Sequence, residues 1–452
     1  MAVPAGYFYK DGAYWNIDGS GPYGISPNGI AVLLGAYPDG ANTIITGGDS
    51  MTANGFYAVS NYSAVNTEGA YTWVDACLGG AFNMQATTAI GGKTCRQMID
   101  EQFPTILAAK PRYCWFTAGT NDLYTDGVGV DTTYDRIIEA VETLLDAGIT
   151  PIWSTIWGRV YNATYTAQAL KVNERLRRYA YTQQAGLFWD GFIPTHDHQS
   201  TNGIGAGRAP LASYFYDSSL HPNNLLGMRT GQFCAASIGS RIYQPNRFVI
   251  GGEDVATGYV GSNLVLNPNF TGTSGTVSAN CTGTMPTSWI IDWATRTGSG
   301  SAAAAIVSLT DATTGLAIGQ AIQITISGTP ASGDIIRVTQ THTENAAFLT
   351  NLSAGNVFNC EGQLGVATGA AVRELRIRAQ VNSNESTWWG VNDKTAVDYP
   401  ATVPMMSCQT RNLTVLGSGA ATAARYDMRV TFSGNSSGTV LTFARPRFRK
   451  VS

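Results

Sequence analysis

Between residues 41 and 250, two spacings of apolar positions alternate along the chain. Short apolar runs within 43–50 and 113–122 have the length of buried strands, and each ends in a polar turn that contains glycine. Longer segments at 132–148 and 166–186 place apolar residues three and four positions apart, as amphipathic helices do. Strands that alternate with helices predict an α/β domain with a flavodoxin-like parallel sheet sandwiched by helices. In such sheets, ligands bind beyond the carboxyl ends of the strands.

After about residue 250 the pattern changes to alternation with a period of two. Thr, Ser, Gly, Ala and Asn dominate, and the alternating segments are 321–328, 335–342, 374–381, 424–434 and 438–448. Several short strands of this kind predict an all-β, jelly-roll-like sandwich over residues 251–452. The boundary between the domains is expected within 245–262. Residues 1–40 show no clear periodicity. We interpret them as an irregular N-terminal segment that packs on the first domain or docks the chain to a partner.

Composition narrows the range of partners. The chain has 452 residues, a formal net charge of −3 and only 13% charged residues. Because a nucleic-acid partner usually needs a basic face, and Arg175–Arg178 fall on a predicted solvated helix, we expect no nucleic-acid partner. The seven cysteines show no CxxC spacing, which argues against a zinc site. Their odd number argues against a simple disulfide framework, although a bridge among Cys281, Cys360 and Cys408 stays open.

The sequence also bears on location. Its first residues, MAVPAGYFYKDGAYW, contain no apolar signal-peptide core. No apolar run reaches the roughly 18 residues of a membrane span, so we expect no membrane partner. A protein of this kind that acts outside a cell would leave it by another route, for instance within a phage particle.

The tripeptide Gly48-Asp49-Ser50 lies between a predicted strand and a predicted helix. A serine on such a turn can expose its hydroxyl while its own N–H points at the same place. One residue then supplies a nucleophile and an oxyanion donor. The same tripeptide also occurs in ordinary turns.

Three further segments carry polar groups at predicted strand ends. Asn121, in Gly-Thr-Asn-Asp at 119–122, has an amide that can donate to an oxyanion or cap a turn. His221, one of only four histidines, follows Asp217 by four residues; imidazole is the usual base for serine, but a histidine before proline is also typical of a structural loop. The Gly91-Gly92 turn within 89–94 offers another backbone N–H or is simply a flexible loop.

In order and spacing, these four segments together resemble the SGNH (GDSL) hydrolase superfamily. They read GGDSMTANG, IGGKT, GTND and DSSLHPNNLLG, and the resemblance covers about residues 41–240. It implies an esterase domain over 41–250 in which Ser50 is the nucleophile, His221 the general base and Asp217 the acid of a triad. It also implies an oxyanion hole formed by the N–H groups of Ser50 and Gly92 and the amide of Asn121. We expect no metal and no cofactor.

Two positions depart from the pattern of that family. The family usually has glycine four residues after the nucleophile, whereas Gly55 is five after Ser50. The acid usually lies three residues before the histidine, where this chain has Ser218. Asp217 can reach the imidazole only if the loop bulges by one residue; the alternatives are a backbone carbonyl or another acid such as Asp197.

Two other histidines, His196 and His198, have the spacing of a metal pair. We interpret them as surface-loop residues, which could also line the substrate cleft, because no carboxylate–cysteine set accompanies them.

In the second half, residues 263–293 resemble the opening of carbohydrate-binding jelly-roll modules, with NLVLNPNF followed by MPTSW. Exposed tryptophans can stack on sugars, but in a sandwich a core position is commoner. The candidates for sugar contact are Trp289, Trp388 and Trp389. One of the adjacent pair Trp388-Trp389 should face outward, because neighbouring side chains of a strand alternate.

An esterase-like domain followed by a Gly- and Thr-rich β-domain also resembles, in organisation, phage tail-fibre and spike proteins. This likeness implies an O-acetylesterase that acts on acylated cell-surface polysaccharide, with other virion proteins as partners and a homo-oligomer, such as a trimer, as its assembly state. Two alternatives stay open: a receptor-binding virion protein whose esterase fold is weak or inactive, and a general lipase or esterase.

Overall fold

The computed structural model describes residues 42–59, 62–160, 163–197, 212–242, 263–310, 317–342, 349, 352–382, 385–392, 396–416 and 420–451, together with four strands between residues 7 and 33. The boundary segment 245–262 and His198 lie outside these residues. No helix in the described ranges is both long and apolar enough to cross a membrane.

The first large unit is built on a five-stranded parallel sheet. Its order is β11-β10-β9-β5-β8, and the strands are β5 (Thr43–Thr46), β8 (Asn83–Thr87), β9 (Tyr113–Trp115), β10 (Thr150–Ser154) and β11 (Leu187–Trp189). Numbered along the chain, this is the flavodoxin-like order 2-1-3-4-5. The predicted α/β fold is therefore confirmed. The strand order reverses between β5 and β9, and ligands of such sheets bind at this position.

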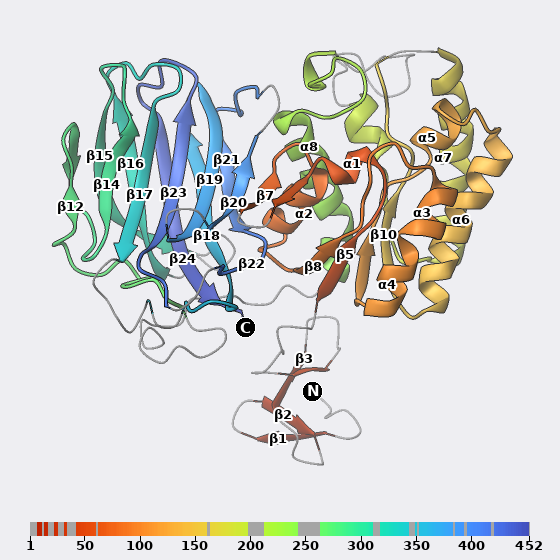
Figure 1. The fold of residues 1–452 in the computed structure, drawn as a ribbon, viewed down its shortest axis with the longest axis horizontal. Helices are drawn as coiled ribbons and strands as arrows, with labels where there is room; N and C mark the ends of the chain where they lie inside the picture. Colours follow the sequence, from red (N-terminus) through yellow and green to blue (C-terminus); the bar gives the residue numbers. More distant parts are fainter. Residues whose placement is uncertain are drawn as a thin grey trace.

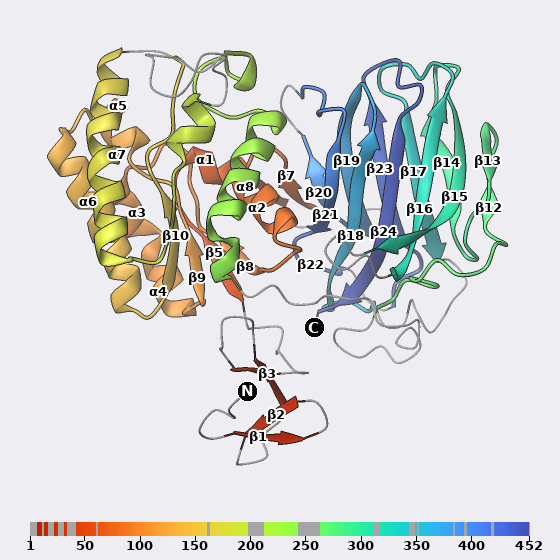
Figure 2. The same cartoon turned by 180° about the vertical axis from the view of Figure 1, so that it is seen from behind.

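Helices cover both faces of this sheet (Figures 1 and 2). They are α1 (Ser50–Ala53), α2 (Ala70–Cys77), α3 (Cys95–Glu101), α4 (Phe103–Ala109), α5 (Thr120–Tyr124), α6 (Val130–Asp146), α7 (Ala163–Gln183) and α8 (Asn224–Ile238), with short turns η1 (Ile193–Asp197), η2 (Ala212–Tyr214) and η3 (Gly239–Arg241). Side chains of one strand alternate between two cores: Ile44 packs with α2 and α8, whereas Ile45 packs with α4 and α6. This alternation follows from the period of two in a strand.

The second large unit is a sandwich of two mixed, largely antiparallel sheets, as predicted. The seven-stranded sheet contains β13 (Cys281–Gly283), β15 (Ser301–Thr310), β16 (Ala317–Ser327), β24 (Val440–Lys450), β18 (Val357–Thr368), β21 (Val403–Gln409) and the short β22 (Leu413–Thr414). The eight-stranded sheet has the order β12-β14-β17-β23-β19-β20-β7-β6. Six of its strands come from the second half: β12 (Thr276–Val277), β14 (Ile290–Thr295), β17 (Ile335–His342), β19 (Val372–Val381), β20 (Glu385–Val391) and β23 (Ala424–Phe432).

The last two strands of the eight-stranded sheet come from the first half of the chain. These strands are β6 (Phe56–Val59) and β7 (Tyr62–Asn66), and β7 pairs in parallel with β20. A hydrogen bond between Ser63 and Thr387 joins the two strands at 2.8 Å. The two halves thus share one sheet across the expected boundary near residue 250, and one hydrophobic core runs through both.

The N-terminal strands correct our expectation of an irregular segment. β1 (Tyr7–Lys10), β2 (Ala13–Asn16), β3 (Pro22–Ile25) and β4 (Ala31–Leu33) form a four-stranded antiparallel sheet. The physical signal was present in the sequence, because Asp11-Gly12, between the paired residues Lys10 and Ala13, is the dipeptide most typical of a two-residue hairpin.

Two of the three tryptophans proposed for sugar contact are core residues. Trp289 and Trp389 are 0% and 1% exposed. Trp389 packs edge-on against Trp73 of α2, and Trp289 packs against Phe270. Both are therefore unavailable to a ligand. Trp388 is partly exposed on the opposite face of its strand, so that one of the adjacent pair faces outward as expected.

All seven cysteines lie in described residues and are free thiols. Cys281, Cys360 and Cys408 therefore form no bridge. Burial raises the pKa of the Cys77 thiol to about 11, and a nearby carboxylate, Asp75, adds to this effect.

The contact between α2 and α8 depends on a glycine. A Cβ built on Gly231 would lie 2.3 Å from Cβ of Trp73 and 2.7 Å from the carbonyl oxygen of Ala70. We expect Gly231→Ala to lower the free energy of unfolding by about 1–3 kcal/mol, because the helices must separate. Gly434→Ala is the control, since its Cβ would meet nothing within 4 Å. Equal urea denaturation midpoints for the two variants would contradict this packing.

Candidate active site

The turn after β5 carries the proposed nucleophile. Gly48 has φ 118, and a Cβ there would lie 2.8 Å from the backbone N and O of Thr117, so only glycine fits. The buried Gln102 binds both sides of this residue: its Oε1 accepts from the Gly48 N–H at 2.8 Å and its Nε2 donates to the Gly48 carbonyl at 2.9 Å. The position of Ser50, the first residue of α1, is thereby fixed relative to β9.

Asp49 is the N-cap of α1 and lies in the interior. Its Oδ1 accepts from the Met51 N–H at 3.0 Å and from the Thr117 hydroxyl at 2.9 Å. Burial raises the pKa of Asp49 to about 6, and these two hydrogen bonds offset only part of that effect. Its contacts make Asp49 a structural residue of the turn.

The structure brings Ser50, His221 and Asp217 into one hydrogen-bonded chain. Nε2 of His221 lies 2.8 Å from Oγ of Ser50, and Nδ1 of His221 lies 2.6 Å from Oδ2 of Asp217. All three residues remain partly open to solvent: the side chains of His221 and Asp217 are 20% and 30% exposed, and Ser50 is partly buried. A substrate can therefore approach the serine hydroxyl.

Asp217 lies four residues before His221 rather than the usual three, and the loop between them accommodates the extra residue. Ser218 has φ 61, in the left-handed region, which is the one-residue bulge that the sequence required. Oδ1 of Asp217 accepts three backbone N–H groups inside this loop, from Ser219 at 3.0 Å, Leu220 at 2.8 Å and His221 at 3.1 Å. Asp217, rather than a backbone carbonyl, thus occupies the position beside Nδ1.

These contacts also set the charge of Asp217. Burial by itself would raise its pKa, but the N–H groups of Leu220, Ser219 and His221, together with the imidazole, outweigh burial and lower the pKa of this carboxyl below its usual range. The group is therefore ionised at neutral pH and can stabilise a protonated imidazole.

Two residues that sequence reasoning missed hold the histidine. The ring of Tyr216 stacks on the imidazole of His221, with centroids 5.4 Å apart and planes 11° apart. Its hydroxyl accepts from Nδ2 of Asn54, which follows α1, at 2.9 Å. The loop is closed by a bridge between Phe215 and Pro222, and Asn223 caps α8 directly after it. No motif in the sequence pointed to Tyr216 or Asn54, nor to Gln102 beside the nucleophile turn.

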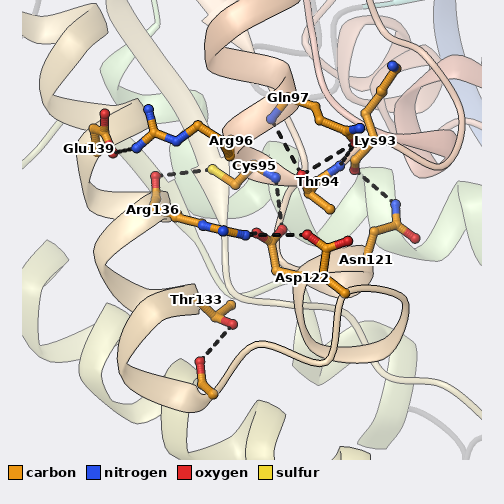
Figure 3. Close-up of polar contacts among 12 residues, drawn as sticks. Lys93, Thr94, Cys95, Arg96, Gln97, Asn121, Asp122, Thr133, Arg136 and Glu139 are labelled. Atoms are coloured by element: carbon orange, nitrogen blue, oxygen red, sulfur yellow. Dashed lines mark hydrogen bonds and ion pairs between the residues drawn. The ribbon is translucent and has the colours of Figure 1, made fainter.

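The groups predicted for an oxyanion hole lie in neighbouring segments. The N–H of Ser50 belongs to the first turn of α1, where N–H groups lack intrahelical acceptors. A Cβ on Gly91 would lie 3.6 Å from Cβ of Ser50, so the Gly91-Gly92 turn runs beside the serine. Asn121, 7% exposed, donates from Nδ2 to the Lys93 carbonyl at 3.0 Å, which ties its loop to that turn (Figure 3). The amide has a second N–H, which is the donor an oxyanion could use.

A buried ion pair supports this region from below. Asp122 is 0% exposed; it accepts from the Cys95 N–H at 2.8 Å and pairs with Arg136 at 2.9 Å (Figure 3). Asp122 adjoins Asn121, and Cys95 begins α3, so the pair holds the two loops together. In the sequence, Asp122 stood out only as part of the Gly-Thr-Asn-Asp segment, and no motif pointed to Arg136.

His196, proposed as a surface-loop residue, is instead buried. It is 8% exposed and stacks on Phe192 with centroids 4.4 Å apart. The aromatic contact explains the difference, because an imidazole next to a phenylalanine is removed from water. Among the described residues, no group of three His, Cys, Asp or Glu side chains could hold a metal ion.

The comparison with protein families supports this fold. Residues 47–225 match the model of the GDSL-like Lipase/Acylhydrolase family. Similar solved structures include a lipolytic G-D-S-L family protein from Veillonella parvula (21% identity, 45% of this chain and all of that chain, TM-score 0.33) and a GDSL-like lipase from Bacteroides thetaiotaomicron (16% identity, 46% of this chain and 90% of that chain, TM-score 0.33).

A third similar structure is a catalytic mutant of an acetylxylan esterase from Geobacillus stearothermophilus. It is 15% identical, and the match covers 44% of this chain and 95% of that chain with a TM-score of 0.36. No curated protein matches this sequence. The match to the family model thus supports a GDSL-like lipase/acylhydrolase domain within residues 47–225.

Proposed function

We propose that this protein is a serine esterase that removes acyl groups, in particular acetyl groups, from O-acylated polysaccharide. The observation that carries the proposal is the chain of two hydrogen bonds from Ser50 through His221 to Asp217. A hydroxyl within 2.8 Å of an imidazole, itself oriented by a carboxylate, is the geometry of an activated serine nucleophile.

The reaction proceeds in two acyl transfers. Oγ of Ser50 attacks the ester carbonyl carbon while Nε2 of His221 takes the hydroxyl proton, and the carbonyl electron pair moves onto oxygen. The imidazolium returns that proton to the leaving sugar oxygen, which releases the alcohol and leaves an acyl-serine. Water, deprotonated by His221, then attacks the acyl-serine; Ser50 regains its proton and the carboxylic acid leaves.

The oxyanion of each intermediate needs donors that are already in place. The N–H of Ser50, a backbone N–H of the Gly91-Gly92 turn and the second amide N–H of Asn121 are the candidates. In comparable sites, one such donor contributes about 3 kcal/mol to transition-state stabilisation. Asp217 stays ionised throughout and stabilises the imidazolium.

The proposal of a short acyl group rests on the side chains around Ser50. Gly91, which runs beside Ser50, has no side chain that could contact a long acyl chain. The place of the protein in a phage particle, its assembly with other virion proteins and a trimeric state rest on sequence organisation alone, and they stay predictions.

Ser50→Ala should abolish hydrolysis of p-nitrophenyl acetate. Loss of the nucleophile lowers kcat by about 10⁴-fold or more in serine hydrolases. Ser237→Ala is the control, since this exposed hydroxyl donates only to the Phe233 carbonyl. Wild-type protein should prefer p-nitrophenyl acetate to the palmitate ester, and should release acetate from acetylated polysaccharide. Undetectable turnover of every ester by wild-type protein would favour the inactive receptor-binding alternative.

Asp217→Asn should lower kcat by about 10³–10⁴-fold, because an amide beside Nδ1 favours the wrong tautomer of His221. The Asn oxygen can still accept the three loop N–H groups, so the fold should persist. Asp131→Asn, on an exposed carboxylate of α6, is the matched control. Activity within tenfold of wild type in both variants would remove Asp217 from the mechanism.

Asp49 should affect stability rather than the chemistry. Its pKa is 3.8 in its ordinary state and about 6 when folded, so between these values the folded chain holds a proton that the unfolded chain has lost. The free energy of unfolding should therefore fall as pH rises from 4 to 6, by about 3 kcal/mol in total from this group.

Asp49→Asn tests this directly, since its oxygen can still accept from Met51 and Thr117. The difference in unfolding free energy between variant and wild type should grow in favour of the variant from pH 4 to pH 6 and then stay constant. Asp100→Asn, exposed on α3, should run parallel to wild type. Parallel urea-denaturation curves for Asp49→Asn would show that the Asp49 carboxyl is not destabilised by burial.

A further inference from the structure

The outer face of the eight-stranded sheet carries a row of side chains that are polar or aromatic except at Ala64. Trp388 is directly paired with Arg378 on β19 and with Ala64 on β7, and Arg378 is paired with Asp427 on β23. Ala64 is paired with Tyr57 on β6. Directly paired residues project from the same side of a sheet. These side chains therefore lie on the side opposite to Trp389 and the core.

Arginines surround the ring of Trp388 on this face. The guanidinium carbons of Arg378, Arg429 and Arg376 lie 4.9, 5.2 and 5.9 Å from the centre of the indole. The indole Nε1 donates to the Ser386 hydroxyl at 3.0 Å, which fixes the ring. We name Tyr57, Trp388 and the arginines 376, 378, 425 and 429 the arginine–tryptophan face.

Charge on and beside this face is positive, although the whole chain carries −3. Asp427 is shared by Arg378 and Arg429, Glu374 pairs with Arg376, and Asp292 pairs with Arg337. Arg425 donates from Nε to the Thr341 hydroxyl at 3.2 Å. Among the described residues of this region, there are thus five arginines and only three carboxylates. A polymer with regularly spaced negative charges complements this excess.

The aromatic side chains are placed for an extended ligand. Tyr57 is 49% exposed, and Trp388 is partly exposed two strands away, about 10 Å at the usual strand spacing. Ala64, between them, is fully buried, so the two aromatic rings on either side of it are left to contact a ligand. Two linked sugar rings span such a separation, and each presents C–H groups that can pack on an aromatic ring.

We propose that the arginine–tryptophan face binds an acidic polysaccharide, with Trp388 and Tyr57 packing on sugar rings and Arg376, Arg425 and Arg429 pairing with carboxylates. Arg378, buried against Asp427, holds the indole in place. This binding is independent of ester hydrolysis, so it can be tested with the nucleophile removed.

The test measures affinity of the full chain carrying Ser50→Ala for polygalacturonate and for the same polymer fully methyl-esterified. The two polymers share a backbone and differ in charge, and the substitution at Ser50 prevents de-esterification. We expect binding to polygalacturonate that weakens as NaCl rises, and at least tenfold weaker binding to the neutral form. Absence of binding to polygalacturonate, or equal affinity for both polymers, overturns the proposal.

Substitutions then locate the site. Trp388→Ala should weaken binding about tenfold, as loss of a central aromatic contact commonly does, and Trp388→Phe should restore part of it. Arg425→Gln should also weaken binding, whereas Arg175→Gln on α7, which removes the same charge from the other domain, should not. Thermal unfolding of each variant checks its fold. If Trp388→Ala proves unfolded, the affinity of the Arg425→Gln variant for polygalacturonate tests the location of the site. Polygalacturonate binding that neither Trp388→Phe nor Arg425→Gln changes would place the ligand elsewhere and overturn the assignment.

Discussion

The close approach of Gly48 to the backbone of Thr117 is the constraint on which the catalytic geometry depends. With no room for a Cβ, the chain leaving β5 crosses directly over the end of β9. Gln102 binds the Gly48 peptide on both sides, and Asp49 reaches Thr117 from the next position. Three independent contacts thus place Ser50 at the point where the strand order reverses, which is the position where a parallel sheet opens toward ligands.

The histidine reaches that point by a separate route. Its loop is built around one carboxylate, since Asp217 accepts three backbone N–H groups and orients the imidazole with its other oxygen. Tyr216 stacks on the ring and reaches Asn54 behind the nucleophile helix. Segments more than 160 residues apart in sequence are therefore joined by side chains as well as by the reacting pair.

Much of this site could be predicted from the sequence, because its parts are short local motifs. Ser50, His221 and Asp217 lie in recognisable segments, and the parallel sheet that brings such segments together follows from the alternation of strands and helices. The contacts of Gln102, Tyr216 and Arg136 could not be predicted, since each depends on a partner far away in sequence. The strands at 56–66 were missed for the same reason: their partner, β20, begins more than 300 residues later. Trp289 and Trp389 were ambiguous because an apolar ring suits a core and a ligand equally well.

The pairing of β7, from the first half of the chain, with β20, from the second half, has a consequence for biosynthesis. β6 and β7 emerge from the ribosome early, but β20 follows only after most of the chain has been made. Until then β7, four of whose five residues end up buried, has no β20 to pair with. Pairing across so long a stretch of chain is slow because the intervening loop must first close. The nascent protein therefore carries an open sheet edge for most of its synthesis, and such an edge is a template for aggregation.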